Sequence, residues 1–162
     1  MSAGGPTRVS LLNRSLDGLA PKFKAAVEAS IAECHAEGLD AVVFESNRSD
    51  VLAAVYYKRG RPPTKEYPTP VTNAPDASWS WHGYGLAVDV ISASKEWSAG
   101  AEWHAKVAAI FKKHSCDWGG DWKAKDLPHF QWGMCKPGPS DVSRTLYAKY
   151  RISEVWELVG AT

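Results

Sequence analysis

The stretch SWHGYGLAVDV, residues 80–90, combines residue types that a folded chain rarely places together. His82 and Asp89 stand among aromatic and aliphatic residues, and burying either side chain is costly unless it finds a partner. The β-branched residues that follow Gly85 predict a buried strand. A regular strand would turn positions seven apart to opposite faces, but Gly83 and Gly85 allow a bend between them. The stretch therefore predicts a bent loop that leads into a strand and brings both polar side chains to one place.

A second polar cluster, KDLPHFQW at residues 125–132, supplies a candidate partner, His129. Pro128 favours extended geometry in the residue before it, so the approach to His129 is stiff. Two histidines and a carboxylate with one open position form a donor set of catalytic zinc, and His82, Asp89 and His129 provide it. The alternative is that His82 and Asp89 hydrogen-bond one another in the core and that His129 is an ordinary core histidine. Spacing alone does not separate these interpretations.

A metal-activated water needs a general base within hydrogen-bond reach to take its proton. Asp126 lies three residues before His129, separated from it by the stiff pair Leu127–Pro128, and is the candidate. Asp117 and Asp121 are rivals, but the glycines around them predict a turn. The remaining histidines stand beside Lys or Glu on predicted helices and are expected at the surface: His35, His104 and His114.

The composition is that of a soluble globular protein, since 44% of the 162 residues are hydrophobic and 23% are charged. The length predicts one domain, which we expect over residues 19–162 after an N-terminal arm at residues 1–18. The net charge of +1, without a run of one sign, argues against nucleic-acid binding. Three widely spaced cysteines predict reduced thiols. The chain has neither a run of ~18 apolar residues to span a membrane nor the apolar run of a signal peptide.

Helical and extended patterns alternate irregularly, which predicts an α+β fold with short antiparallel strands. Helices are expected at residues 21–37, 50–59, 101–114 and 140–150, strands at 39–46, 85–91 and 128–132, and a short final element at 152–159. Five prolines exclude a helix or central strand from residues 61–78, so a long loop is expected there. Seven of the eight tryptophans lie between Trp79 and Trp132, either as core packing or as a groove for an extended substrate.

The stretch SWHGYGLAVD resembles the SxHxxGxAxD signature of a family of zinc peptidases, the D-alanyl-D-alanine carboxypeptidases and L-alanyl-D-glutamate endopeptidases. The stretch WGGDWKAKDLPHFQW, from Trp118, resembles a second signature that is common in phage endolysins that cut the L-Ala–D-Glu bond of peptidoglycan. The signatures stand in the family's order, and the resemblance runs from roughly Leu16 to His129 and beyond. It implies the fold of these peptidases and of hedgehog domains, a small antiparallel sheet with helices packed on it.

The resemblance also implies roles for individual residues. It assigns the zinc to three ligands, His82, Asp89 and His129. It makes Asp126 the base that deprotonates a metal-activated water. Arg48, in FESNRSD, corresponds to a family arginine that steadies the substrate or the developing oxyanion, and Ser80 is expected to support the site near the substrate. Relatives often carry a glutamine early in the helix after this arginine, whereas this chain has DVLAAVYY.

These implications predict a phage endolysin that binds the peptidoglycan stem peptide as a monomer and hydrolyses its L-Ala–D-Glu bond. Without a signal peptide, such a protein would be made in the host cytoplasm and would reach the cell wall or periplasm through a holin-type lesion. One alternative is a D-Ala-D-Ala carboxypeptidase or dipeptidase. Another is a non-catalytic zinc-containing module that binds the cell wall, because hedgehog domains use this fold without catalysis. The presence of Asp126 favours an enzyme.

Overall fold

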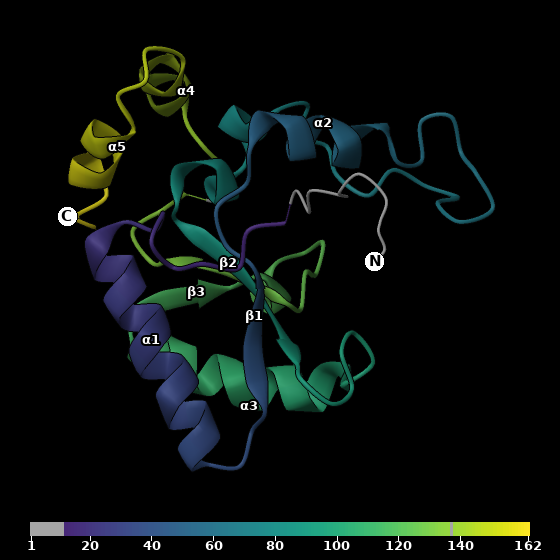
Figure 1. Cartoon of the computed structure of the whole chain (residues 1–162), viewed down its shortest axis with the longest axis vertical. Helices are drawn as coiled ribbons and strands as arrows, with labels where there is room; N and C mark the ends of the chain where they lie inside the picture. Colours follow the sequence, from purple (N-terminus) through teal and green to yellow (C-terminus); the bar gives the residue numbers. More distant parts are fainter. Residues whose placement is uncertain (1–11, 137) are drawn as a thin grey trace, which may run out of the picture.

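The computed structural model describes residues 12–136 and 138–162, in which five helices surround a four-stranded antiparallel sheet (Figure 1). The strands lie in the order β1-β2-β4-β3, with bounds β1 (Ala41–Glu45), β2 (Ala87–Ser92), β4 (His129–Trp132) and β3 (Cys116–Trp118). The α+β prediction is confirmed. The strand β3 differs from the expected turn: its three residues precede two glycines, which favour a turn in the sequence, yet they pair with β4. Of the predicted arm at residues 1–18, the first eleven residues lie outside the described part.

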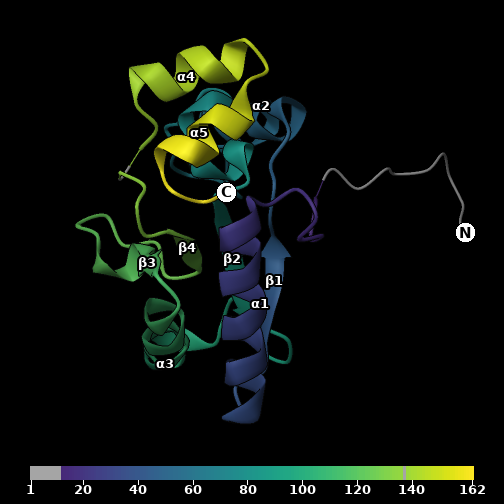
Figure 2. The same cartoon turned by 90° about the vertical axis from the view of Figure 1, so that its left-hand side faces the viewer.

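The five helices lie around the sheet. Their bounds are α1 (Pro21–Ala36), α2 (Asp50–Lys58), α3 (Gly100–Lys113), α4 (Asp141–Ala148) and α5 (Ile152–Leu158). Figures 1 and 2 show α1 running alongside the strands with α3 near its lower end, and α2, α4 and α5 above the sheet. Serine side chains cap two of the helices: the hydroxyl of Ser49 accepts the Leu52 N–H at the start of α2 at 3.2 Å, and that of Ser140 accepts the Ser143 N–H at the start of α4 at 3.1 Å. None of the helices in the described residues is both long and apolar enough to cross a membrane.

A single hydrophobic core joins the sheet to its helices. The ring of Phe111 on α3 stacks on that of Phe130 on β4, with centroids 4.2 Å apart. The core extends from Leu19 to Ala161, and all three cysteines are buried in it as free thiols. The surface prediction for His104 is wrong, because this side chain is 2% exposed and its Nδ1 finds no partner in the described residues. His104 lies on the buried face of α3, where burial lowers its pKa and keeps the imidazole neutral.

The connection from α2 to β2 delivers the first polar cluster to the sheet. After the long loop, the chain forms two short 3-10 turns, η1 (Ala77–Trp79) and η2 (Trp81–Tyr84). Gly85 follows η2 with φ of +67°, a left-handed conformation that turns the chain into β2. Gly83 packs so tightly that a Cβ there would lie 2.2 Å from the carbonyl oxygen of Ala77. Both glycines therefore serve the predicted bend between His82 and Asp89.

The register of the sheet fixes where the polar residues meet. Asp89 on β2 is paired with His129 on β4 and, on its other side, with Glu45 at the end of β1. The far end of the β1–β2 pair is held by Asp40, whose carboxylate accepts hydrogen bonds from Ser94 and Ser92. These hydrogen bonds lower the pKa of Asp40 to about 2. Asp89 is thus placed at the centre of the sheet with a polar neighbour on either side.

Candidate metal centre

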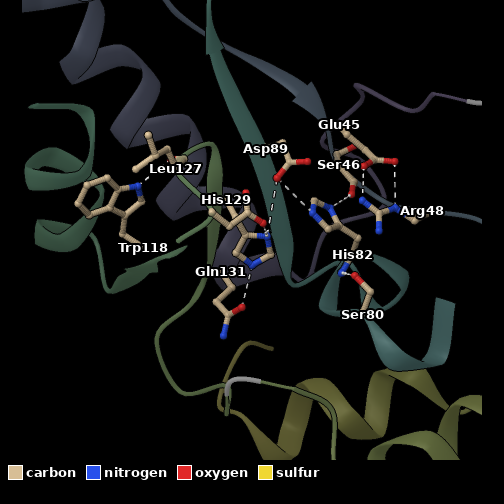
Figure 3. Close-up of polar contacts among 11 residues, drawn as sticks. Glu45, Ser46, Arg48, Ser80, His82, Asp89, Trp118, Leu127, His129 and Gln131 are labelled. Carbon is tan, nitrogen blue, oxygen red and sulfur yellow. Dashed lines mark hydrogen bonds and ion pairs between the residues drawn. The ribbon is translucent and has the colours of Figure 1, made fainter. Parts of the chain in front are cut away.

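Three side chains from three elements converge on one another, with Asp89 between His82 and His129 (Figure 3). His82 comes from η2, Asp89 from β2 and His129 from β4. The Oδ1 atom of Asp89 lies 3.4 Å from Nε2 of His82 and 3.7 Å from Nδ1 of His129. One ligand atom from each residue lies within 4.8 Å of the other two. The structure therefore brings together the three residues that the sequence predicts as ligands.

Hydrogen bonds on the outer side of each imidazole turn its lone pair inward. The Nδ1 atom of His82 lies 2.9 Å from the carbonyl oxygen of Ser46, which can only accept, so Nδ1 carries the proton. The Nε2 atom of His129 lies 2.8 Å from Oε1 of Gln131 and donates to it. Gln131 is itself oriented, because its amide N–H donates to the carbonyl oxygen of Lys136 at 3.1 Å. Each histidine therefore directs its other ring nitrogen at Asp89, where that nitrogen can carry a proton or bind a metal ion.

Two lone pairs and a carboxylate that face one another need a cation between them. Burial alone would raise the pKa of Asp89, but the attraction of His82 and the hydrogen bonds of both histidines hold it well below its usual range. Burial alone would lower the pKa of His129, but the hydrogen bond and the negative charge of Asp89 raise the pKa of this imidazole. The cluster thus attracts positive charge. Its two imidazole nitrogens and one carboxylate oxygen fit zinc, with a position left for water or substrate.

Asp126 is the carboxylate that borders this cluster. Its Oδ2 atom lies 4.0 Å from Nδ1 of His129. Its side chain is 50% exposed and lines the cavity that contains the cluster, which we call the groove. Burial and the charge of Asp89 raise the pKa of Asp126, which makes its carboxylate a stronger base. Asp121 instead pairs with Lys112, with 2.7 Å between Oδ2 and Nζ, and neither it nor the exposed Asp117 lines the groove.

Arg48 and Ser80 stand on the other side of His82. The guanidinium of Arg48 forms two bonds with the buried Glu45, Nε–Oε2 at 3.2 Å and Nη2–Oε1 at 2.5 Å. The backbone N–H of Arg48 donates to the carbonyl oxygen of His82 at 2.8 Å, which ties it to the cluster. The hydroxyl of Ser80 accepts the His82 N–H at 3.3 Å and so caps η2. Both Arg48 and Ser80 line the groove. Figure 3 shows the two side chains beside His82.

The cluster lies in a cavity of about 1230 Å³. Four tryptophans contribute to its lining, and two of them are well exposed, Trp79 at 46% and Trp97 at 52%. Other tryptophans pack instead, as shown by Trp118, whose indole N–H donates to the carbonyl oxygen of Leu127. Some tryptophans therefore line the cavity and others pack in the core, while a role in binding substrate stays a prediction. The returning part of the proline-rich loop, residues 71–74, also lines the cavity.

Several residues of the site were missed by sequence reasoning. Gln131 stands two residues after His129 on one strand, so the period of two places both side chains on the same face and could have indicated it. Trp122 borders the cluster, with its ring 4.9 Å from that of His129. Ser46 contributes only a carbonyl oxygen to His82, for which the sequence gives no signal. Glu45 was overlooked although it lies three residues before Arg48.

Comparison with known proteins gives consistent results. Residues 73–132 match the profile of the D-alanyl-D-alanine carboxypeptidase family. The peptidoglycan L-alanyl-D-glutamate endopeptidase CwlK of Bacillus subtilis (strain 168) is 34% identical over 126 residues, 70% of this chain and 72% of that protein. The L-Ala D-Glu endopeptidase ChiX of Serratia marcescens has a TM-score of 0.56 at 23% identity, over 72% of this chain and 82% of that one. A D,D-pentapeptidase, VanY, in complex with Zn(II), has a TM-score of 0.53 at 14% identity, over 92% and 91% of the chains. The last two likenesses concern the fold.

Proposed function

Since the chain belongs to the D-alanyl-D-alanine carboxypeptidase family of metallopeptidases, we propose that it is an endopeptidase that hydrolyses the L-Ala–D-Glu bond of peptidoglycan stem peptides. The observation that carries this proposal is the convergence of His82, Asp89 and His129 beside Asp126 in one large groove. The likeness to the Bacillus endopeptidase favours this bond. The cavity of about 1230 Å³ around the cluster is large enough for a peptide.

Zinc is the cofactor of this family. We assign it to Nε2 of His82, a carboxylate oxygen of Asp89 and Nδ1 of His129, because these atoms face one another. When bound, zinc supplies Lewis acidity at the scissile carbonyl and makes nearby water more acidic. The carbonyl oxygen of Ser46 and the side chain of Gln131 accept the outer ring protons, so the two inner nitrogens are directed inward and are free to bind the metal.

Different residues around the cluster transfer the proton and stabilise the developing negative charge. Asp126 takes the proton of the attacking water and passes it to the nitrogen of the leaving amine, in keeping with its raised pKa. Arg48, held by Glu45, offsets the negative charge that develops on the carbonyl oxygen. Ser80 fixes the backbone of His82 and stands where substrate would pass.

Digestion of purified sacculi tests the bond that is cut. We expect fragments with a new N-terminal D-Glu, identified by end-group analysis and mass spectrometry. Release of D-alanine without new D-Glu termini would instead support the D-Ala-D-Ala carboxypeptidase or dipeptidase. Binding to sacculi with no cleavage would support a non-catalytic module, a function that the placement of Asp126 beside the cluster argues against.

Replacing the proposed base separates catalysis from metal binding. In Asp126→Asn, kcat on a stem peptide should fall by roughly 100- to 10,000-fold, because the amide cannot take a proton. Zinc content should stay at the wild-type level, since the proposed ligands are intact. Asp121→Asn is the matched control, because this carboxylate pairs with Lys112 and does not line the groove. An unchanged kcat in Asp126→Asn would show that another group is the base.

The biological setting stays a prediction from the sequence. We propose that residues 19–162 form one catalytic domain, which the continuous core from Leu19 to Ala161 supports. We also propose that the protein acts as a monomeric phage endolysin released to the wall through a holin-type lesion. Expression in bacteria with and without a holin would test this, since lysis should require the holin.

A further inference from the structure

One wall of the groove carries a second arginine that the proposed mechanism does not use. Arg59 lies at the C-terminal end of α2 and lines the cavity together with Arg48. The charge of Arg48 is balanced by Glu45, and the charge of Asp89 is balanced by the histidines and the proposed zinc. Arg59 forms no ion pair with any carboxylate in the described part of the chain. It is therefore a cation of the groove wall without a protein counter-charge.

Aromatic rings hold Arg59 in place. Its guanidinium carbon lies 5.0 Å from the ring centroid of Tyr56 and 5.1 Å from that of Tyr67. The Tyr56 ring also contacts Arg48, at 4.8 Å, so one ring joins the two arginines. Burial raises the pKa of Tyr56 to about 12, so its hydroxyl is neutral at physiological pH. Arg59 is thus held in a row of side chains that begins at the metal cluster and ends at the loop.

The backbone around Arg59 is also fixed. The carbonyl oxygen of Arg59 accepts the Val71 N–H at 3.4 Å, which brings the returning loop against the end of α2. Gly60 has φ of +83°, and a Cβ there would lie 2.2 Å from the carbonyl oxygen of Thr69. The contact is therefore tight, and Val71 lines the cavity beside Arg59. A cation held from two sides loses little freedom when it binds an anion.

We propose that Arg59 binds a free carboxylate of the peptide substrate, an inference that rests on the proposed function. In a stem peptide, D-Glu is linked through its γ-carboxyl group, so a free α-carboxylate stands on the same residue whose nitrogen forms the scissile bond. A C-terminal carboxylate is the other source of the same chemistry. The planar guanidinium suits a two-pronged contact with either group. Arg59 is then a specificity-determining residue, and a peptide amidated at the recognised carboxyl group is a poor ligand.

Binding to an inactive enzyme tests this without relying on cleavage. The Asp126→Asn variant, loaded with zinc, is titrated by calorimetry with peptides of the sequence L-Ala-γ-D-Glu-L-Lys-D-Ala. One peptide has both carboxylates free, a second is amidated at the D-Glu α-carboxyl group, and a third is amidated at the C-terminus. Arg59→Gln, Arg59→Lys and Lys58→Gln are added to this variant. Lys58→Gln removes a neighbouring positive charge that does not line the groove and is the matched control.

Arg59→Gln should raise the Kd of the fully free peptide by roughly 10-fold or more, whereas Lys58→Gln should leave it unchanged. One amidated peptide should bind weakly from the start and should not respond to Arg59→Gln, which identifies the recognised carboxylate. Arg59→Lys should recover part of the loss. Equal responses of all three peptides, no response, or no binding of any peptide would overturn the proposal. The wild-type cleavage site is measured separately, so an error in the proposed bond is distinguished from an error about Arg59.

Discussion

Gln131 is the residue that sets the orientation of His129. Its Oε1 accepts the Nε2–H of His129, and its own amide is fixed by the carbonyl oxygen of Lys136. In Gln131→Leu the ring loses this acceptor, so zinc affinity should fall by roughly 10- to 100-fold. Competition with a chromogenic chelator measures the change, and circular dichroism checks that the variant is folded. An unchanged affinity would show that the strand alone orients the ring.

At this scale the sequence predicts the residues that carry unusual chemistry but not the groups that orient them. His82, Asp89, His129 and Asp126 stand out because a polar side chain among apolar residues requires a partner. The acceptor for His82 is a backbone carbonyl 36 residues away, and every residue type has one. Such partners are set by tertiary packing, so single-sequence reasoning cannot identify them.

The turn from η2 into β2 depends on Gly85. A Cβ at Gly85 would lie 2.2 Å from the carbonyl oxygen of Gly18, and its φ of +67° disfavours a side chain. Gly38 has a similar φ of +78° but open space around it. A substitution at Gly38 therefore measures the cost of the backbone conformation alone, without a steric clash. Gly38→Ala should destabilise by about 1–2 kcal/mol, and Gly85→Ala by a further ~1–3 kcal/mol from overpacking. Urea unfolding measures both, and equal losses would contradict the clash.

Most helices and strands are predicted from the sequence, and the exception is the three-residue strand β3. The helices predicted at residues 21–37, 50–59 and 140–150 agree with α1, α2 and α4 to within a few residues at each end. The strand β3 has three residues and pairs with β4. Local sequence does not indicate such a pairing, because the partner strand lies elsewhere in the chain. His104 was misplaced because its charged neighbours indicated solvent, although its position on α3 turns it toward the core.

Zinc should stabilise the whole molecule, because it binds the folded cluster and not the separated ligands. At free zinc about 1,000 times above its Kd, the stabilisation is about 4 kcal/mol. Chelation should therefore lower Tm by on the order of 10 °C in a domain of this size. Scanning calorimetry with and without chelator measures the shift, and added zinc should reverse it. Asp89→Asn should show a much smaller shift, and a wild-type Tm that ignores chelation would contradict the assignment.

The order of the elements along the chain has a consequence for synthesis. His82 and Asp89 come first along the chain, whereas His129 arrives with β4, which must pair with β2 before the third group reaches the cluster. A ribosome-bound fragment that ends before β4 carries two of the three proposed metal ligands, and we expect it to bind metal weakly. On the proposed ligand assignment, we therefore expect hydrolytic activity only after β4 has joined the sheet.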